Sequence, residues 1–237
     1  MISSVNNPSV KEWAKYQQKK YRDQDQKLLI EGPHLVDLAL SEAKVEVILT
    51  LEPNPHYPQA RQVSEHVMKK ITGHTPPIAA IIEKPSPSGG EARVLLLDRV
   101  QDPGNIGTLM RSALAFGFDR LVLYQCADPY SAKVVRATQG ALFRLPIEVL
   151  KDPNDLQKRF PQHQILAAML EGSTPQPLCA SLVLILGNEG QGISDAFLNQ
   201  AHQQLTIQTR NVESLNVAVA GSILMHQLTQ GLDLSST

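Results

Sequence analysis

Three segments of the chain combine polar side chains with glycines in a way that suits ligand binding. The first, DRVQDPGNIG (residues 98–107), links an apolar run to a helical one. Asn105 can cap that helix, and Gly107 lets the backbone approach another group closely. Arg111 follows Asn105 by six residues, under two helical turns, so both side chains can lie near the same end of the helix. In isolation, a simple cap and a surface arginine explain the pattern equally well.

The second segment, LGNEGQG (residues 186–192), places three glycines around Glu189 and suits a loop that wraps a flat ligand with backbone groups. It matches neither G-x-G-x-x-G nor a phosphate-binding P-loop, which argues against a nicotinamide dehydrogenase or a nucleoside triphosphatase. The third segment, NVESLNV (residues 211–217), offers Ser214 as an N-cap with Asn216 in the first turn of a helix. Taken alone, capping is the better explanation of this third segment.

The elements that must position these segments alternate between strands and helices. Short apolar runs are typical of buried parallel strands, whereas longer stretches with apolar residues at helical spacing are typical of helices. This alternation predicts an α/β fold, a parallel sheet with helices on both faces and a site at the carboxyl ends of the strands. The predicted strands are Val94–Leu97, Leu121–Tyr124, Ile165–Ala168 and Leu182–Leu186; the predicted helices are Ile106–Phe116, Ala132–Leu142, Asp195–Gln200 and Ser214–Leu228.

A proline- and glycine-rich break, PSPSGG (residues 85–90), separates this part from a smaller α/β part. We therefore expect a small domain at residues 1–85, a linker at 86–91 and a larger domain at 92–237. The small domain is expected to contain a helix from Pro8 to about Tyr21, a helix after Gly32-Pro33, a strand at Val45–Leu49, a helix after Pro58 and a strand at Ile78–Ile82.

Composition narrows the class of protein. The net charge of −1 argues against a protein that coats nucleic acid by bulk electrostatics, although residues 1–27 carry six basic and three acidic side chains. The sequence offers no membrane span, no signal peptide and no metal-ligand spacing. Cys126 and Cys179 are expected to be small buried thiols, and a cytoplasmic setting fits.

Taken together and in this order, the three segments resemble the motifs of the SpoU (TrmH-type) RNA 2′-O-methyltransferases of the SPOUT superfamily. The matching stretches are LDRVQDPGNIGTLMRSALAFGFDRLVLY (97–124), LILGNEGQGIS (184–194) and VESLNVAVAGSILMHQ (212–227). SAKVVRATQGALFRLPI (131–147) is also similar to the family. KKYRDQDQKLLIEGPHLVDLAL and IAAIIEKP look like the small substrate-binding domain that many members carry.

The resemblance implies a trefoil-knotted catalytic domain that binds S-adenosylmethionine, and a homodimer formed through that domain. By the same resemblance, Gly187, Ile207 and Leu215 should contact the cofactor. The positions that match the family's catalytic residues are Asn105, Arg111, Glu189, Ser214 and Asn216. The expected reaction is methylation of a ribose 2′-hydroxyl in RNA, with ribosomal RNA as the expected substrate.

A mechanism can be outlined as a hypothesis. The family assigns much of the proton removal to the Arg111 position, but a guanidinium rarely deprotonates, so we interpret Arg111 as a clamp oriented by Asn105. The proton acceptor is then phosphate, water or Glu189. In the small domain, Lys19, Lys20 and Arg22 are candidate phosphate contacts. The alternatives are a SPOUT enzyme acting on a base nitrogen or on tRNA, an inactive RNA-binding relative and a plain nucleotide-binding module.

Overall fold

The computed structural model describes residues 1–177 and 181–232, which form two compact units. The N-terminal unit comprises Met1–Ser86 and Tyr130–Phe143, and the C-terminal unit Pro87–Pro129 and Arg144–Thr237. The chain thus leaves the first unit inside the proline-rich segment. Residues 130–143, which the sequence pattern assigned to the larger domain, pack with the first unit instead. Cys179 lies outside the described residues.

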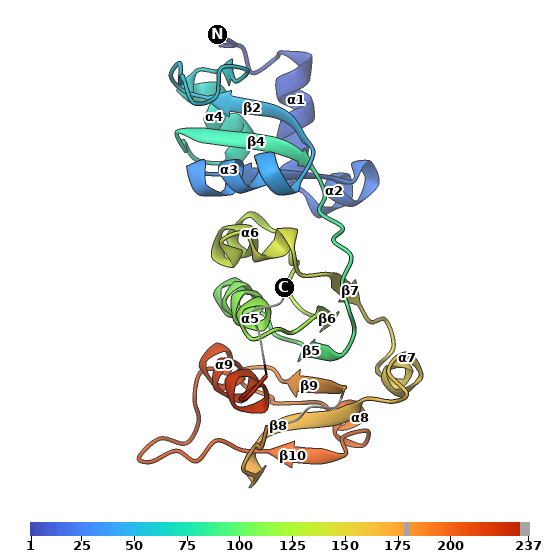
Figure 1. Cartoon of the computed structure of the whole chain (residues 1–237). Coiled ribbons are helices and arrows are strands. Elements are labelled where there is room, and N and C mark those ends of the chain that lie inside the picture. Colours follow the sequence, from blue (N-terminus) through green and yellow to red (C-terminus); the bar gives the residue numbers. More distant parts are fainter. Residues whose placement is uncertain (178–180, 233–237) are drawn as a thin grey trace. The chain divides into compact units, whose positions relative to one another are not determined.

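The N-terminal unit is built on a four-stranded mixed sheet in the order β1-β4-β2-β3. α1 and α4 pack on one face, where Trp13, Val67 and Ile71 share a core with Leu49 and Ile81 of the strands. α3 and α6 contact strands of the same sheet. The elements, shown in Figure 1, are α1 (Pro8–Ala14), η1 (Lys15–Gln17), α2 (Lys19–Asp25), β1 (Lys27–Glu31), α3 (Pro33–Glu42), β2 (Val45–Thr50), β3 (Arg61–Gln62), α4 (Glu65–Thr72), β4 (Ile78–Glu83), α6 (Ala132–Thr138) and η2 (Ala141–Phe143).

The expectation of one helix from Pro8 to about Tyr21 is wrong. Gln18 has an extended backbone (φ −98°, ψ 131°) and separates η1 from α2. Arg22 Nη1 donates to the carbonyl oxygens of Tyr16 and Gln17, both at 2.8 Å, so it satisfies groups that the break leaves unpaired. β1 was not predicted from the sequence. The predicted helix Ala132–Leu142 ends early, at Thr138, because Gln139 and Gly140 have left-handed φ values of 48° and 94°.

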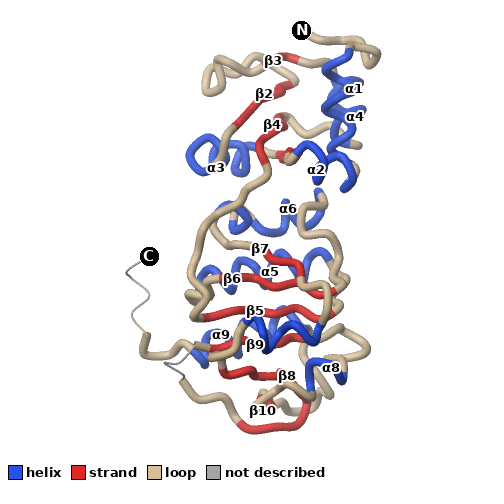
Figure 2. Tube along the Cα trace, turned by 90° about the vertical axis from the view of Figure 1, so that its right-hand side faces the viewer, coloured by secondary structure: helices blue, strands red, loops and turns tan. Residues whose placement is uncertain are grey.

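The C-terminal unit is built on a six-stranded, fully parallel sheet in the order β10-β8-β9-β5-β6-β7 (Figure 2). This confirms the expected α/β architecture, and all four strands predicted for this part are present. Its elements are β5 (Arg93–Asp98), α5 (Pro103–Ala115), β6 (Arg120–Tyr124), β7 (Ile147–Val149), η3 (Pro153–Asp155), α7 (Leu156–Arg159), β8 (Gln164–Ser173), β9 (Leu182–Leu186), α8 (Asp195–Leu198), β10 (Gln203–Leu205) and α9 (Val217–Leu228).

Helices cover both faces of this parallel sheet. On one face, strand residues such as Val183 form a core with Leu156 of α7 and Phe197 of α8. On the other face, α5 packs on α9. A Cβ at Gly221 of α9 would lie 2.4 Å from Leu186 Cδ1 and 2.6 Å from Leu109 Cδ2, so glycine lets this helix lie close to β9 and α5. The knot implied by the resemblance concerns how the last segment is threaded, and it stays a prediction.

Candidate functional site

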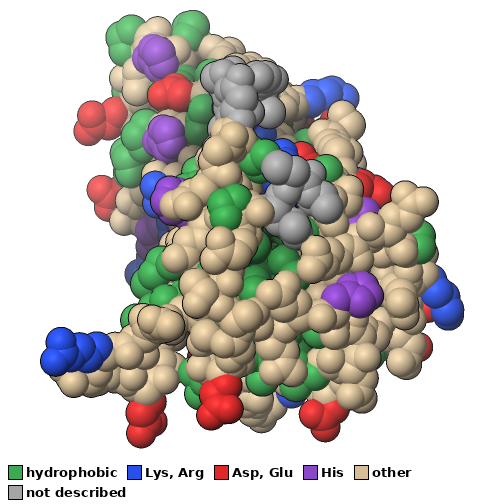
Figure 3. Space-filling model, turned by 60° about the horizontal axis from the view of Figure 1, so that its bottom comes forward, with side chains coloured by type: hydrophobic (Ala, Val, Ile, Leu, Met, Phe, Trp, Pro, Cys, Tyr) green, Lys and Arg blue, Asp and Glu red, His purple; other side chains and the backbone are tan. Residues whose placement is uncertain are grey.

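A pocket of about 890 Å³ opens in the C-terminal unit where β8, β9 and β10 end. Its walls are the second half of β8, the loop after β9 and the loop from Thr206 to Asn216 that leads into α9. Parallel sheets form ligand sites at the carboxyl ends of their strands, because the loops that follow neighbouring strands converge there. Figure 3 shows the molecule with the bottom of Figure 1 turned forward, and on this face the Lys, Arg, Asp and Glu side chains lie mostly toward the margin of the view. The pocket is large enough for a ligand the size of a nucleoside.

The loop after β9 is folded tightly upon itself. The backbones of Asn188 and Gly192 exchange two hydrogen bonds, at 3.1 and 2.9 Å, and Asn188 Oδ1 accepts from the N–H groups of Gly190 and Gln191. A Cβ at Gly187 would lie 2.3 Å from the carbonyl carbon of Gly192. Only glycine fits there without moving backbone, so the loop presents main-chain groups to the pocket.

The three residues expected to contact a cofactor line this one pocket. Gly187 lies at the start of the loop after β9, whereas Ile207 and Leu215 belong to the loop that precedes α9. Glu189, Ser214 and Asn216, from the expected catalytic set, also line it. The structure therefore brings together six positions that lie in two separate stretches of the sequence.

Asn105 links the two loops at the edge of the pocket. Its Nδ2 donates to Glu189 Oε1 (2.9 Å), and its Oδ1 accepts from Asn216 Nδ2 (3.0 Å). The sequence suggested that Asn105 caps α5, but the N-cap is Asp102, whose Oδ1 accepts from the backbone N–H of Asn105 (2.8 Å). The side chain of Asn105 is consequently available to hold Glu189 and Asn216 in place.

The N-cap of α9 also differs from the expectation. Asn216, not Ser214, caps the helix, since Asn216 Oδ1 accepts from the N–H groups of Ala218 (2.9 Å) and Val219 (3.3 Å). Ser214 is exposed on the wall of the pocket. The side-chain amide of Asn216 therefore caps α9 and also donates to Asn105. These contacts fix the direction in which α9 leaves the pocket.

Arg111 is not hydrogen-bonded to this polar group. It is exposed on α5 and makes no hydrogen bond or ion pair within the described residues. The expectation that Asn105 orients Arg111 is corrected, because the hydrogen bonds of the Asn105 side chain go to Glu189 and Asn216. Arg111 instead presents a solvated guanidinium two turns along the helix that begins at the pocket.

The candidate phosphate contacts of the N-terminal unit differ from one another. Lys19 and Lys20 are exposed at the start of α2; Lys19 Nζ lies 3.1 Å from Asp23, and Lys20 Nζ lies 5.6 Å from the centre of the Tyr21 ring. Arg22 is only 3% exposed and binds backbone carbonyl oxygens. The prediction that Arg22 contacts phosphate is therefore wrong: its guanidinium is a structural group inside the unit.

Two residues that organise the site had no role in the sequence-based prediction. Asp98 is fully buried at the end of β5, and its Oδ2 accepts from the backbone N–H of Ser194 (2.6 Å). Arg99 follows it and reaches the loop after β9. The sequence did offer a signal for this role, because Asp98 directly follows the apolar run Val94–Leu97 and a buried carboxylate needs hydrogen-bond partners.

The described residues, 1–177 and 181–232, contain no cluster of His, Cys, Asp or Glu that could hold a metal ion. None of the helices in these ranges is long and apolar enough to cross a membrane. Burial raises the pKa of the Cys126 thiol to about 11, and its Sγ lies 3.2 Å from the carbonyl oxygen of Leu97. Cys126 is thus a neutral thiol and not a nucleophile, but it is half-buried and not fully buried as expected from the sequence.

Comparison with known proteins agrees with this geometry. Residues 92–226 match the model of the SpoU rRNA methylase family, and residues 7–81 match an MRM3-like substrate-binding domain. The chain belongs to the SpoU rRNA methylase family. Because the first match covers the whole parallel-sheet unit up to α9, it includes every expected catalytic and cofactor position.

Relatives of this SpoU family member cover nearly its full length. It is 35% identical to the 23S rRNA (guanosine(2553)-2′-O)-methyltransferase RlmP of Bacillus subtilis, over 96% of this chain and 98% of the relative. The AdoMet-bound rRNA methyltransferase of Sinorhizobium meliloti superposes with a TM-score of 0.82 at 29% identity and 98% coverage of both chains. An RNA 2′-O ribose methyltransferase superposes with a TM-score of 0.78 at 27% identity, covering 96% and 97%.

Proposed function

We propose that this SpoU family member transfers a methyl group from S-adenosylmethionine to a ribose 2′-hydroxyl of ribosomal RNA. The observation that carries the proposal is the amide of Asn105, which joins Glu189 and Asn216 at the edge of a glycine-walled pocket. Full-length similarity to a 23S rRNA 2′-O-methyltransferase supports the choice of reaction and substrate. Because ribosomal RNA is the substrate, we place the enzyme in the cytoplasm.

The pocket suits the cofactor. Its volume of about 890 Å³ lies within the range of small-molecule sites, and its glycine loop leaves backbone groups facing the ligand. Gly187, Ile207 and Leu215 would hold the cofactor from two sides. When bound, S-adenosylmethionine supplies a methyl carbon that its sulfonium already activates, so the protein must mainly align the nucleophile.

The polar side chains would do that alignment. Asn105 keeps Glu189 and Asn216 in fixed positions beside the pocket, and Ser214 adds a hydroxyl on the wall. Arg111 would clamp the ribose and a neighbouring phosphate through its planar donor fork. Correct orientation of two reactants can lower a barrier by roughly 7–11 kcal/mol, so holding the hydroxyl in line accounts for a large share of catalysis.

The reaction is tested by incubating the protein with ribosomal RNA and S-adenosylmethionine labelled in the methyl group. We expect label in 2′-O-methylated nucleosides after complete nuclease digestion. Label in a methylated base would support a base-nitrogen enzyme, preference for tRNA would change the substrate, and absence of transfer would indicate an inactive RNA-binding relative. Each of these three results contradicts the proposal.

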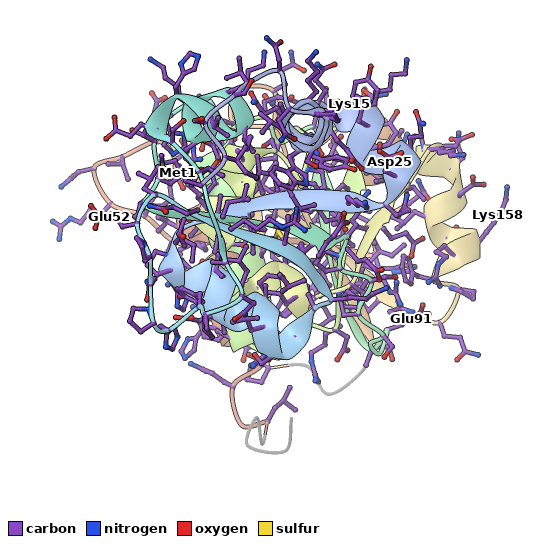
Figure 4. All side chains as sticks on the ribbon, turned by 90° about the horizontal axis from the view of Figure 1, so that it is seen from above. Met1, Lys15, Asp25, Glu52, Glu91 and Lys158 are labelled. Atoms are coloured by element: carbon purple, nitrogen blue, oxygen red, sulfur yellow. The ribbon has the colours of Figure 1, made fainter. Side chains whose placement is uncertain are left out.

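The N-terminal unit is proposed to bind the RNA, as its match to a substrate-binding domain suggests. Lys19 and Lys20 are exposed, as is Lys15, which lies at the periphery in Figure 4. Changing Lys19 and Lys20 together to glutamine should reduce the slope of log K against log salt by about 1.5, because about two counterions fewer are released on binding.

The matched control for this charge change is the pair Lys151→Gln and Lys158→Gln, which removes the same charge from exposed positions of the other unit. The slope should stay at the wild-type value in the control. An unchanged slope for the Lys19 and Lys20 variant, measured by filter binding over a salt series, would remove these lysines from the interface.

We further propose that the C-terminal unit forms a homodimer through α5 and α9. The two helices pack together, with Ser112 Oγ and Ser222 Oγ 2.7 Å apart, and each carries an exposed aliphatic residue: Leu114 is 36% and Val219 is 48% exposed. Covering such side chains favours association. Sedimentation equilibrium should give twice the 26.0 kDa of the chain, and the mass of a monomer would contradict the dimer.

A further inference from the structure

Arg99 has a backbone conformation that side chains seldom adopt. Its φ of 58° lies in the left-handed region, where residues with a Cβ are uncommon. The conformation is held from both sides: Arg99 N–H donates to the carbonyl oxygen of Tyr124 (2.8 Å), and Arg99 O accepts from Asn188 Nδ2 (2.8 Å). A strained residue that is fixed in this manner is a candidate for a functional role.

The guanidinium of Arg99 connects a buried carboxylate to the loop after β9. Nε and Nη2 donate to the two oxygens of Asp98, at 2.9 and 3.3 Å. Nη1 donates to Gln191 Oε1 (2.8 Å) and Nη2 to the carbonyl oxygen of Gly192 (3.2 Å). The hydrogen bond to Asp98 raises the pKa of Arg99, so the group stays charged. Such charge-assisted bonds are stronger than neutral ones.

These contacts matter because the sheet no longer holds the chain at this point. The pairing of β9 with β5 ends at Leu186 and Leu97, one residue before the loop starts. Arg99 then makes three hydrogen bonds to the loop, through Asn188, Gln191 and Gly192. Asp98 adds a fixed point on the far side through the N–H of Ser194. Hydrogen bonds to Asp98 and Arg99 thereby attach both ends of the loop to the end of β5.

We infer that Arg99 is the positioning residue of the cofactor loop: it holds residues 188–192 in the conformation that binds S-adenosylmethionine, without touching the cofactor. Arg99 is absent from the described residues that line the pocket, whereas its three loop partners line it. This inference rests on the proposed function, because it assigns the pocket to S-adenosylmethionine. The role is one of preorganisation, in which a rigid loop binds with less loss of conformational freedom.

The test replaces Arg99 with asparagine, which tolerates left-handed φ but lacks the guanidinium. We expect the dissociation constant for S-adenosylhomocysteine, measured by calorimetry, to rise about tenfold, the usual loss for hydrogen bonds to a charged group. KM for the cofactor should rise while kcat at saturation changes little. Arg99→Lys should recover part of the affinity, and Gln191→Ala, which removes one bond, should show a smaller loss.

Hydrogen exchange of residues 187–193 in the ligand-free protein reports on the loop without any cofactor. It should be faster in Arg99→Asn and unchanged in the control Arg93→Gln, at the opposite end of β5, whose Nε binds the carbonyl oxygen of Gly117. Wild-type loop exchange and wild-type affinity in Arg99→Asn would overturn the inference. Failure of the wild-type protein to bind S-adenosylhomocysteine would refute the proposed cofactor, while loop exchange would still decide the role of Arg99.

Discussion

Replacing Arg111 with alanine is expected to lower kcat by about 10²–10³-fold, the usual cost of removing a group that stabilises the transition state. The affinity for S-adenosylhomocysteine should stay within about twofold, because Arg111 is not among the described residues that line the pocket. Arg111 is exposed on α5, the helix whose first turn carries Asn105. Single-turnover methyl transfer and calorimetry on the same preparations measure the two effects.

Arg111→Lys separates charge from shape. Lysine keeps the positive charge but lacks the planar fork that pairs with two oxygens, so we expect activity between those of the wild type and Arg111→Ala. Transfer at the wild-type rate by Arg111→Ala would show that this arginine is only a surface residue. Loss of cofactor affinity equal to the loss of kcat would show that it acts on the pocket instead of the ribose.

Exchanging Asn105 for aspartate is expected to lower kcat/KM for RNA by about 10²-fold, a loss typical of a misaligned reacting group. The substitution removes the amide donor that lies 2.9 Å from Glu189 Oε1 and places a second carboxylate there. Like charges at that distance repel, so the loop after β9 would separate from the start of α5. Asn105→Ala removes both hydrogen bonds without repulsion, and its loss should be nearer tenfold. Steady-state transfer assays compare the two variants.

Asp102→Asn is the matched control for Asn105→Asp. It changes the charge in the same turn by one unit, and asparagine caps a helix as well as aspartate does. This variant should keep kcat/KM within about twofold of the wild type, since cap substitutions of this kind cost little. If Asn105→Asp were as active as Asn105→Ala, repulsion from Glu189 would not matter. Wild-type activity of Asn105→Ala would contradict the joining role of Asn105.

Elements with strong apolar patterns were predictable from the sequence. The strands β5 and β9 contain continuous apolar runs, at Val94–Leu97 and Leu182–Leu186, and burial on both faces of a parallel sheet requires that pattern. The short strand β7 has three residues, too few for a pattern to be recognised. The sequence indicates a strand at Leu205–Ile207, but β10 ends at Leu205 and begins two residues earlier, at Gln203. For residues 130–143, helical spacing indicated an apolar face, but spacing does not say which unit buries that face.

The site was predictable as a set of residues but not as a set of contacts. The three motifs identify Asn105, Glu189 and Asn216, yet their hydrogen bonds join positions 84 and 111 residues apart. Both cap assignments failed because several polar residues near each helix start can cap it, and tertiary partners decide between them. Arg22 was misassigned for a related reason: a basic residue in a basic stretch gives no sign that its guanidinium is buried.

The most direct test of the account is a crystal structure of the protein with S-adenosylhomocysteine. We expect the ligand in the pocket formed by the loops at residues 187–192 and 206–216, with its sulfur facing the side where Asn105 joins Glu189 and Asn216. A ligand bound at another place, or bound here with those three side chains separated, would contradict the account.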